Sequence, residues 1–123
     1  MENWKLTWTK LDVLNERAAK GIPNNLPGVY RLSYRHEDGN FYVFYVGQST
    51  DIKVRLSQHL DLDTETNETI KFYIKSKECY FRYAQISEEY IRKAAERQMF
   101  KHYQPKGNNI VPEGRDDVRV NLT

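Results

Sequence analysis

Residues 28–60 read GVYRLSYRHEDGNFYVFYVGQSTDIKVRLSQHL, and this stretch decides the fold. The runs 28–35 and 41–47 are rich in Val, Tyr and Phe, which are residues that favour β-strands. Asp38 and Gly39 lie between the two runs, and an Asp-Gly pair in that place is a strong signal for a β-hairpin. The sequence therefore predicts two antiparallel strands joined by a tight turn.

This turn also predicts which residues of the hairpin face each other. If Asp38 and Gly39 are the two turn residues, Tyr30 lies opposite Gly47 and Leu32 lies opposite Tyr45. The two tyrosines then project from the same face as diagonal neighbours, roughly 7–8 Å apart at the backbone. A glycine opposite Tyr30 leaves room for the phenol ring to lean inward.

A helix is expected directly after the hairpin. Residues 49–51 are Ser, Thr and Asp, whose side chains commonly cap the first turn of a helix. Three apolar residues then recur at a spacing of four, namely Ile52, Leu56 and Leu60. Arg55 and His59 are also four residues apart, so both lie along one edge of this apolar stripe.

The other elements follow from hydrophobic spacing and from helix-breaking residues. The sequence predicts helices over 9–20, 66–76 and 87–103, a strand over 78–86 and a short edge strand in the segment 118–122. Antiparallel strands with helices between and after them indicate an α+β layer fold. We expect a small three-stranded antiparallel sheet flanked by helices. Residues 1–26 would form an N-terminal helical extension packed on a domain of residues 27–123, whose end is a polar C-terminal tail.

Composition limits the class of protein. A chain of 123 residues fits one domain, and 39% hydrophobic with 13% aromatic residues indicates a folded protein rather than a disordered one. The formal net charge is only +2, so any affinity for nucleic acid depends on where the charges lie. The single cysteine, Cys79, excludes an intramolecular disulfide and a cysteine-based zinc site. No run of about 20 apolar residues and no signal peptide is present, so a cytoplasmic protein without a membrane partner is expected.

Four polar residues of the central stretch suit the cleavage of a phosphodiester bond. Arg55 is always cationic and can hold a phosphate at two points, and His59 titrates near neutrality and can pass a proton. A phenol such as Tyr30 or Tyr45, with a usual pKa of about 10, acts as a base only where a cation or metal lowers that value. Arg55 or His59 beside it would do this. Each residue alone also has an ordinary explanation, as a surface arginine, a structural histidine or a packing tyrosine.

Glu96, on the helix predicted over 87–103, is the candidate metal ligand. It lies off the apolar face of that helix, where a solvated surface glutamate is the ordinary explanation. A single carboxylate is nevertheless enough for Mg²⁺, because this ion keeps several waters and takes further ligands from substrate phosphate. Four more residues are expected to line a substrate-binding edge: Gly47, Lys53, Lys101 and Asn108.

The motifs Gly28-Val29-Tyr30 and Tyr45-Val46-Gly47, with the arginine and histidine that follow them, resemble the GIY-YIG nuclease family. The later run from Glu96 to Asn108 is similar to that family's glutamate helix and its trailing Pro and Asn. The resemblance covers residues 27–108, and two valines stand where the family has isoleucines. Asn109 follows Asn108 directly, so that position is uncertain by one residue.

The resemblance implies a role for each of these residues. Glu96 would bind one divalent metal ion, Mg²⁺ or Mn²⁺, and Tyr30 would be the general base toward the attacking water. Arg55 and Tyr45 would position and stabilise the phosphate, and His59 would assist proton movement. The expected activity is hydrolysis of DNA, with specificity supplied by DNA structure, a homodimer or a partner protein. Two alternatives stay open, which are a catalytically silent module that binds nucleic acid or protein, and a nuclease that acts on RNA.

Overall fold

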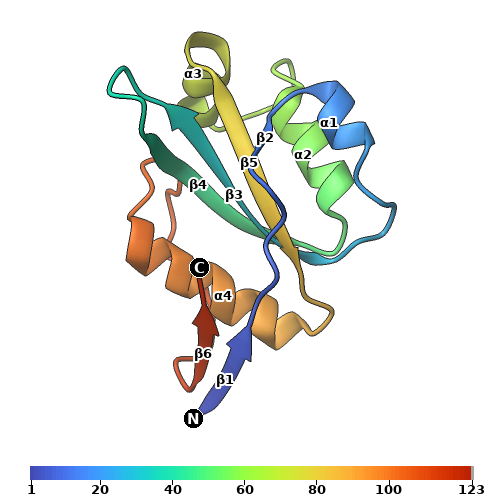
Figure 1. Cartoon of the computed structure of the whole chain (residues 1–123), viewed down its shortest axis with the longest axis vertical. Coiled ribbons are helices and arrows are strands. Elements are labelled where there is room, and N and C mark those ends of the chain that lie inside the picture. Colours follow the sequence, from blue (N-terminus) through green and yellow to red (C-terminus); the bar gives the residue numbers. More distant parts are fainter. Residues whose placement is uncertain (123) are drawn as a thin grey trace.

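The computed structural model describes residues 1–122, which form two β-sheets and four helices (Figure 1). The strands are β1 (Glu2–Lys5), β2 (Asp12–Val13), β3 (Gly28–Arg35), β4 (Phe41–Ser49), β5 (Cys79–Gln85) and β6 (Val118–Asn121). The helices are α1 (Glu16–Lys20), α2 (Ile52–Leu60), α3 (Glu68–Ser76) and α4 (Glu89–Tyr103). The larger sheet has the strand order β2-β5-β3-β4, and β1 pairs with β6 in a separate two-stranded sheet.

The hairpin of β3 and β4 has the predicted register around the two motif tyrosines. Tyr30 lies opposite Gly47 and Leu32 lies opposite Tyr45. Nearer the tip the predicted two-residue turn is wrong, since the pairing is Arg35 with Phe41 and a register shift follows Leu32. The loop is therefore one residue longer than predicted, and the irregularity in β4 restores the register.

The expected three-stranded sheet is in fact four-stranded, because a short segment near the N-terminus covers the outer edge of β5. β2 pairs antiparallel with β5, and Thr9 N–H and Leu14 N–H donate to backbone carbonyls of β5 on either side of it. An exposed strand edge carries unpaired backbone groups, so this segment satisfies them. The predicted helix over 9–20 is accordingly reduced to Glu16–Lys20, which begins where the Asn15 side chain accepts a hydrogen bond from Ala18 N–H.

The two faces of the larger sheet belong to two separate cores. One core contains Tyr30, Leu32 and Phe81 of the sheet and receives α1, α2 and α3. The other contains Val29, Val46 and Ala84 and receives α4 together with β1 and β6. In Figure 1, α1 and α2 lie on one side of the sheet and α4 crosses its lower end.

The remaining sequence-based elements are confirmed within one or two residues. The helices predicted over 66–76 and 87–103 are α3 and α4, and the strand predicted over 78–86 is β5. The predicted C-terminal strand is β6, and its partner is the parallel strand β1. In the described range 1–122, no helix combines the length and the apolar character that crossing a bilayer requires.

Candidate active site

Tyr30 lies in the middle of β3 with only 1% of its surface exposed. Gly47 makes this position available, because a Cβ added there would lie 2.4 Å from both Cζ and Oη of the Tyr30 phenol. The Tyr30 ring of the first motif therefore packs directly against the backbone of Gly47 in the second motif. This is the close approach that the sequence predicted.

His59 meets the Tyr30 hydroxyl from the inner face of α2. Tyr30 Oη and His59 Nε2 are 2.8 Å apart, and the imidazole is fully buried. The Tyr45 ring completes the cluster, edge-on to the imidazole at a centroid distance of 5.1 Å and 6.1 Å from the Tyr30 ring. The predicted helical stripe places His59 here, with Ile52 and Leu56 buried beside it.

The other imidazole nitrogen of His59 faces a buried carboxylate that the sequence analysis missed. His59 Nδ1 and Glu65 Oε2 are 3.1 Å apart, and the Glu65 side chain is 7% exposed. Glu65 Oε1 accepts a hydrogen bond from Asn67 N–H, and the Asn67 side chain donates to the Gly107 carbonyl. Glu65 lies in the loop between α2 and α3, where no periodicity relates it to His59, so no sequence pattern could have indicated this contact.

These contacts define the protonation state of His59. Burial, reinforced by the Arg55 guanidinium and opposed by Glu65, lowers the pKa of His59 to about 4. The imidazole is therefore neutral near pH 7. Its Nδ1–H donates to Glu65, which leaves Nε2 to accept the hydrogen bond from the Tyr30 hydroxyl.

Tyr30 itself is a neutral phenol in this environment. Burial, followed by the neighbouring Tyr45, raises its pKa well above the usual value, although Arg55 opposes the shift. The expectation of a net lowering of the Tyr30 pKa is therefore wrong, because desolvation of the buried phenol outweighs the effect of the Arg55 cation. Burial also lowers the pKa of Arg55, but the Tyr30 and Tyr45 phenols more than offset this and the net shift is upward.

Glu96 lies in a cavity of about 330 Å³ that Tyr45, Asn67 and Asn108 also line. Burial raises the pKa of Glu96 to about 7. A hydrogen bond from the Gln48 backbone and the charge of Lys93 act in the opposite direction but are weaker. A half-buried carboxyl with a raised pKa is stabilised in its charged form by a cation, and carboxylate oxygens suit a hard divalent ion as ligands. Within residues 1–122 no group of three His, Cys, Asp or Glu side chains is placed to hold a metal ion. The donor set therefore fits an ion that takes one carboxylate and completes its shell with water and phosphate.

Asn108 closes the outer edge of β4 beside this cavity. Its side chain accepts from Val46 N–H at 2.9 Å and donates to the Val46 carbonyl at 2.8 Å. Gly107 N–H donates to the Phe44 carbonyl at 2.7 Å. The sequence left open whether Asn108 or Asn109 takes the asparagine position of the motif. In the structure Asn108 makes the contact with Val46, and Asn109 is exposed.

The two predicted lysines make other contacts. Lys53 Nζ donates to the Asn24 side chain at 2.8 Å. Lys101 lies 3.4 Å from Asp116 and lines a different hollow with Gln98 and Val118. No described contact brings either lysine to the tyrosine cluster, and Arg55 is the cation beside it.

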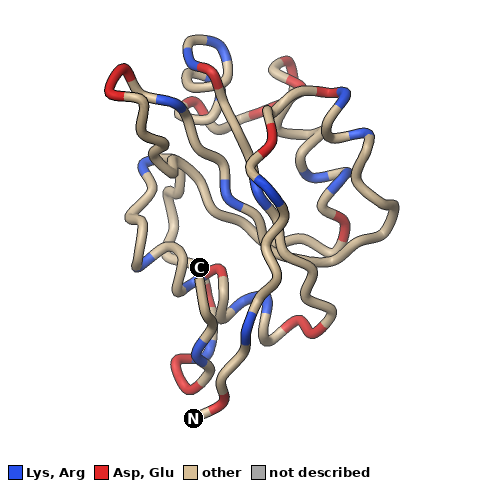
Figure 2. Tube along the Cα trace, in the orientation of Figure 1, with Lys and Arg blue, Asp and Glu red and all other residues tan. Residues whose placement is uncertain are grey.

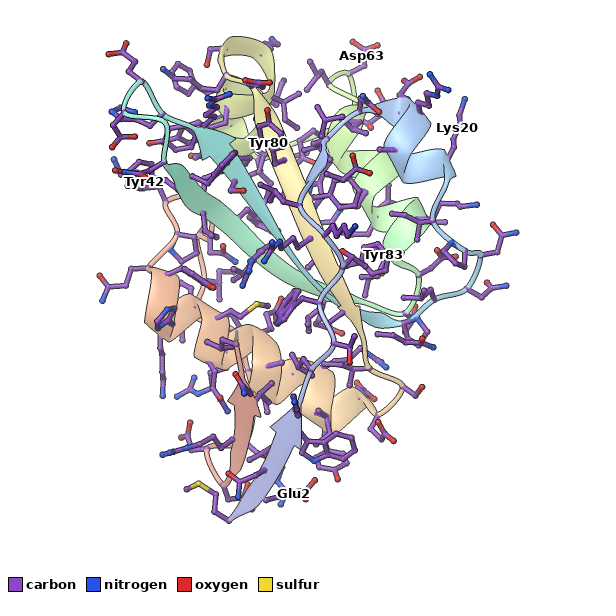
Figure 3. The ribbon with its side chains drawn as sticks, in the orientation of Figure 1. Glu2, Lys20, Tyr42, Asp63, Tyr80 and Tyr83 are labelled. Carbon is purple, nitrogen blue, oxygen red and sulfur yellow. The ribbon has the colours of Figure 1, made fainter. Side chains whose placement is uncertain are left out.

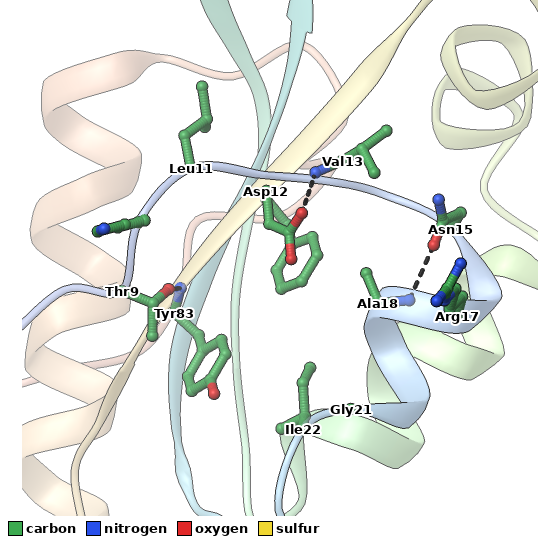
Figure 4. A pocket seen from close by; sticks show the side chains of 12 residues that line it. Thr9, Leu11, Asp12, Val13, Asn15, Arg17, Ala18, Gly21, Ile22 and Tyr83 are labelled. Carbon is green, nitrogen blue, oxygen red and sulfur yellow. Dashed lines mark hydrogen bonds between the residues drawn. The ribbon is translucent and has the colours of Figure 1, made fainter.

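A roomier cavity of about 770 Å³ lies between β2, α1 and β5, with Tyr83 and Phe81 on its sheet side (Figure 4). Its polar groups serve the local fold. Asp12 accepts from Val13 N–H, and Asn15 caps α1. This hollow holds none of the predicted site residues.

Comparison with known proteins agrees with the geometry. The family model for the GIY-YIG catalytic domain matches residues 26–109. The chain belongs to the GIY-YIG family. Its similar relatives include UvrABC system protein C of Rickettsia canadensis (strain McKiel), 31% identical over 95 residues, and that of Rickettsia bellii (strain RML369-C), 31% identical over 97 residues. Each match covers 77% of this chain, which spans only 14% of the relative's length.

Solved structures show the same GIY-YIG fold. The magnesium-bound GIY-YIG N-terminal endonuclease domain of UvrC from Thermotoga maritima matches 76% of this chain and 94% of that domain, with 22% identity and a TM-score of 0.56. A point mutant of that domain, bound to its catalytic divalent cation, matches 77% of this chain and 96% of its own, with 21% identity and a TM-score of 0.57. At this identity the likeness concerns the fold.

Proposed function

We propose that this GIY-YIG domain is a metal-dependent endonuclease that hydrolyses DNA phosphodiester bonds. The observation that carries the proposal is the buried hydrogen bond between the Tyr30 hydroxyl and His59 beside the Tyr45 ring, together with the cavity that Tyr45 shares with the Glu96 carboxyl. Placing a proton acceptor, a cation and an isolated carboxylate beside two neighbouring phenols is costly for a structural core. A phosphodiester hydrolase needs each of these groups.

The cofactor in this proposal is one Mg²⁺ or Mn²⁺ ion, with Glu96 as its protein ligand. The UvrC domain structures from Thermotoga maritima are described as bound to a catalytic divalent cation, which supports the assignment. When bound, such an ion supplies Lewis-acid stabilisation of charge on the phosphate and leaving oxygens. A metal ion binds the deprotonated form of Glu96 and therefore competes with its proton. Because the pKa of Glu96 is raised to about 7, we expect metal affinity to increase as the pH rises through 7.

The chain's own residues supply a path for the proton. The Tyr30 oxygen accepts a proton from the attacking water as its own hydroxyl proton passes to His59 Nε2. The phenol thus acts as a neutral relay, which fits its raised pKa, and His59 is the group that gains charge. Arg55 stabilises the negative charge that develops on the phosphate, and Tyr45 holds the phosphate between the two halves of the site.

The partner in this proposal is DNA, in the cytoplasm and without a membrane. The chain spans 14% of the length of its UvrABC system protein C relatives, so the activity and partners of those whole proteins are not carried over to it. We therefore expect specificity to come from DNA structure, from a second copy of the chain, or from a partner protein.

The test is cleavage of supercoiled plasmid, branched DNA and single-stranded DNA, each with Mg²⁺, with Mn²⁺ and with a chelator. Glu96→Gln and Tyr30→Phe are the site variants. Glu89→Gln is the matched control on the same helix, because Glu89 is exposed and pairs with Lys93 at 3.0 Å. We expect metal-dependent cutting that both site variants lose and the control keeps.

Two outcomes would overturn the proposal. Metal-independent binding of DNA without cleavage, unchanged by Glu96→Gln, would indicate a silent binding module. Cleavage of a matched RNA strand in preference to DNA would keep the chemistry and move the substrate to RNA.

A further inference from the structure

Two arginines lie side by side on the sheet face opposite the Tyr30 phenol. Arg31 of β3 is directly opposite Arg82 of β5 in the antiparallel register, and both are half-buried. Like charges at directly opposite positions of a sheet destabilise it. Figure 2 shows Lys and Arg positions on neighbouring strands in the middle of the sheet, away from the acidic loops at its ends.

No carboxylate among residues 1–122 neutralises this pair. The ion pairs of the described chain involve other residues, and neither Arg31 nor Arg82 lies within 4.0 Å of a described acidic side chain. Burial lowers the pKa of Arg31, and Arg82 adds to this effect although Tyr103 opposes it. Two adjacent cations without a counter-charge among the described residues are costly for the fold, so an anion bound beside them would stabilise it.

Arg31 donates to the Tyr103 hydroxyl and to the Leu122 carbonyl, whereas two donors beside it have no acceptor. In the described part of the chain, the buried side-chain polar atoms that have no hydrogen-bond partner are Arg82 Nε and Trp8 Nε1. Trp8 packs against the Arg31 guanidinium, whose Cζ is 4.6 Å from the ring centroid. Tyr103 accepts a hydrogen bond from Arg31 at 2.6 Å, and its hydroxyl proton is then directed away from the arginine. Both unpartnered atoms are donors, and both belong to residues next to Arg31.

We infer that Arg31, Arg82 and Trp8 form a binding site for a phosphate of the nucleic-acid backbone, separate from the phosphate that is cut. Guanidinium groups bind phosphate oxygens at two points, and indole N–H groups donate to the same kind of acceptor. An anion there neutralises the pair and supplies the acceptors that Arg82 Nε and Trp8 Nε1 lack. The identity of the polymer as DNA rests on the proposed function, whereas the site itself rests on the charges and donors described above.

The arginine pair lies in the same row of the sheet as the residue that Asn108 contacts. Arg82, Arg31 and Val46 lie in one register row across three strands, and Asn108 binds the outer edge of Val46. Neighbouring strands are about 4.8 Å apart, so the backbones of Arg31 and Arg82 lie roughly 5–10 Å from the backbone of Val46.

The test is binding of a short fluorescein-labelled DNA duplex, followed by anisotropy at several salt concentrations in the presence of a chelator. The variants are Arg82→Gln, which removes the charge, and Trp8→Phe, which removes the indole N–H and keeps an aromatic ring. Arg115→Gln is the matched control, because Asp117 already neutralises Arg115. We expect Arg82→Gln to weaken binding about tenfold and to reduce the salt dependence by about one phosphate contact, and Trp8→Phe to weaken it less.

Every outcome of this experiment bears on the site. Equal effects of Arg82→Gln and Arg115→Gln, or an unchanged salt dependence, would show that the pair binds no backbone phosphate. Inorganic phosphate that raises the melting temperature of the wild type but not of Arg82→Gln, with DNA binding unaltered in both, would mean that the site takes a free phosphate ion. Because no cleavage is measured, failure of the proposed nuclease activity would leave these results intact.

Discussion

Gly47 determines where the Tyr30 phenol lies, and one methyl group is enough to test this. In Gly47→Ala the new Cβ would come within 2.4 Å of the phenol, and the buried ring has no free space into which to move. We expect the variant to lose about 1–3 kcal/mol of unfolding free energy and to lose the contact between Tyr30 and His59. Denaturant unfolding and plasmid cleavage measure the two effects. Gly21→Ala is the control, because Gly21 has a φ of −74° and a Cβ added there would come no closer than 3.4 Å to its nearest neighbour. A stable, active Gly47→Ala protein would contradict the argument.

Glu65 is expected to hold His59 in the tautomer that accepts the Tyr30 proton. Glu65→Gln keeps the size of the side chain but removes the negative charge beside the imidazole that becomes charged during the reaction. By comparison with the orienting carboxylate of a serine-protease triad, we expect at least a roughly tenfold loss of turnover. Cleavage rates as a function of pH measure it, with exposed Glu68→Gln as control. An unchanged rate and pH profile would leave Glu65 with a structural role only.

The pKa of His59 also predicts how stability depends on pH. The unfolded histidine has a pKa of about 6.5 and the folded one a pKa of about 4, so below pH 6.5 the unfolded chain binds more protons. This contribution is fully present above pH 6.5 and is lost as the pH falls toward 4, on the order of 3 kcal/mol in total. Thermal unfolding at several pH values checks it. His59→Gln should show a shallower loss over the same window, and parallel curves would contradict the prediction.

At the level of single residues, sequence reasoning predicted most of the candidate site and missed what depends on loops. Tyr30, Tyr45 and His59 were predictable because strand pairing and helix periodicity fix their relative positions. Glu65 was not predictable, because the path of the loop over 61–67 decides where it points. The pKa of Tyr30 was predicted with the wrong sign, since the pattern shows which charges are near but not how completely the phenol is buried.

At the scale of elements, the outer edge of β4 has its backbone hydrogen bonds at Val46 satisfied by a side chain instead of a neighbouring strand. Asn108 pairs with both backbone groups of Val46, so Asn108→Ala should leave a partly buried N–H and carbonyl without partners. We expect a loss of about 1–3 kcal/mol of unfolding free energy, measured by denaturant titration. Asn109→Ala is the matched control and should be near neutral. The opposite ranking would show that Asn109 is the residue that contacts the site.

The elements also show where local sequence signals stop being sufficient. The Asp-Gly signal gave the hairpin, and the register at Tyr30 was right although the tip differs by one residue and an irregularity restores the pairing. β2 was missed because two residues carry no recognisable alternation, and only the open edge of β5 makes them a strand. Long periodic elements such as α4 are specified locally, whereas short edge strands are specified by their partners.

At the scale of the molecule, the terminal strands β1 and β6 and the larger sheet contribute residues to one hydrophobic core. β1 runs parallel to β6, as the lower part of Figure 3 shows around Glu2, and both pack on α4. Leu6, Val118 and Val120 lie in the same apolar cluster as Val29 and Val46 of the central sheet. α4 is thus held between the sheet and the two terminal strands, and it is the helix that carries Glu96.

This arrangement predicts that residues 1–26 and the domain of 27–123 unfold as one unit. Leu6 is 6% exposed, so Leu6→Ala should remove about 2–5 kcal/mol of unfolding free energy and shift a single cooperative transition. Val54→Ala is the control, because Val54 is 48% exposed on α2. Near-ultraviolet circular dichroism, which senses the aromatic core around Tyr30, and far-ultraviolet signals from the helices should move together. An early transition that Leu6→Ala shifts alone, with the aromatic signal unchanged, would instead mean that the N-terminal segment is a separable extension and that Glu96 keeps its place without it.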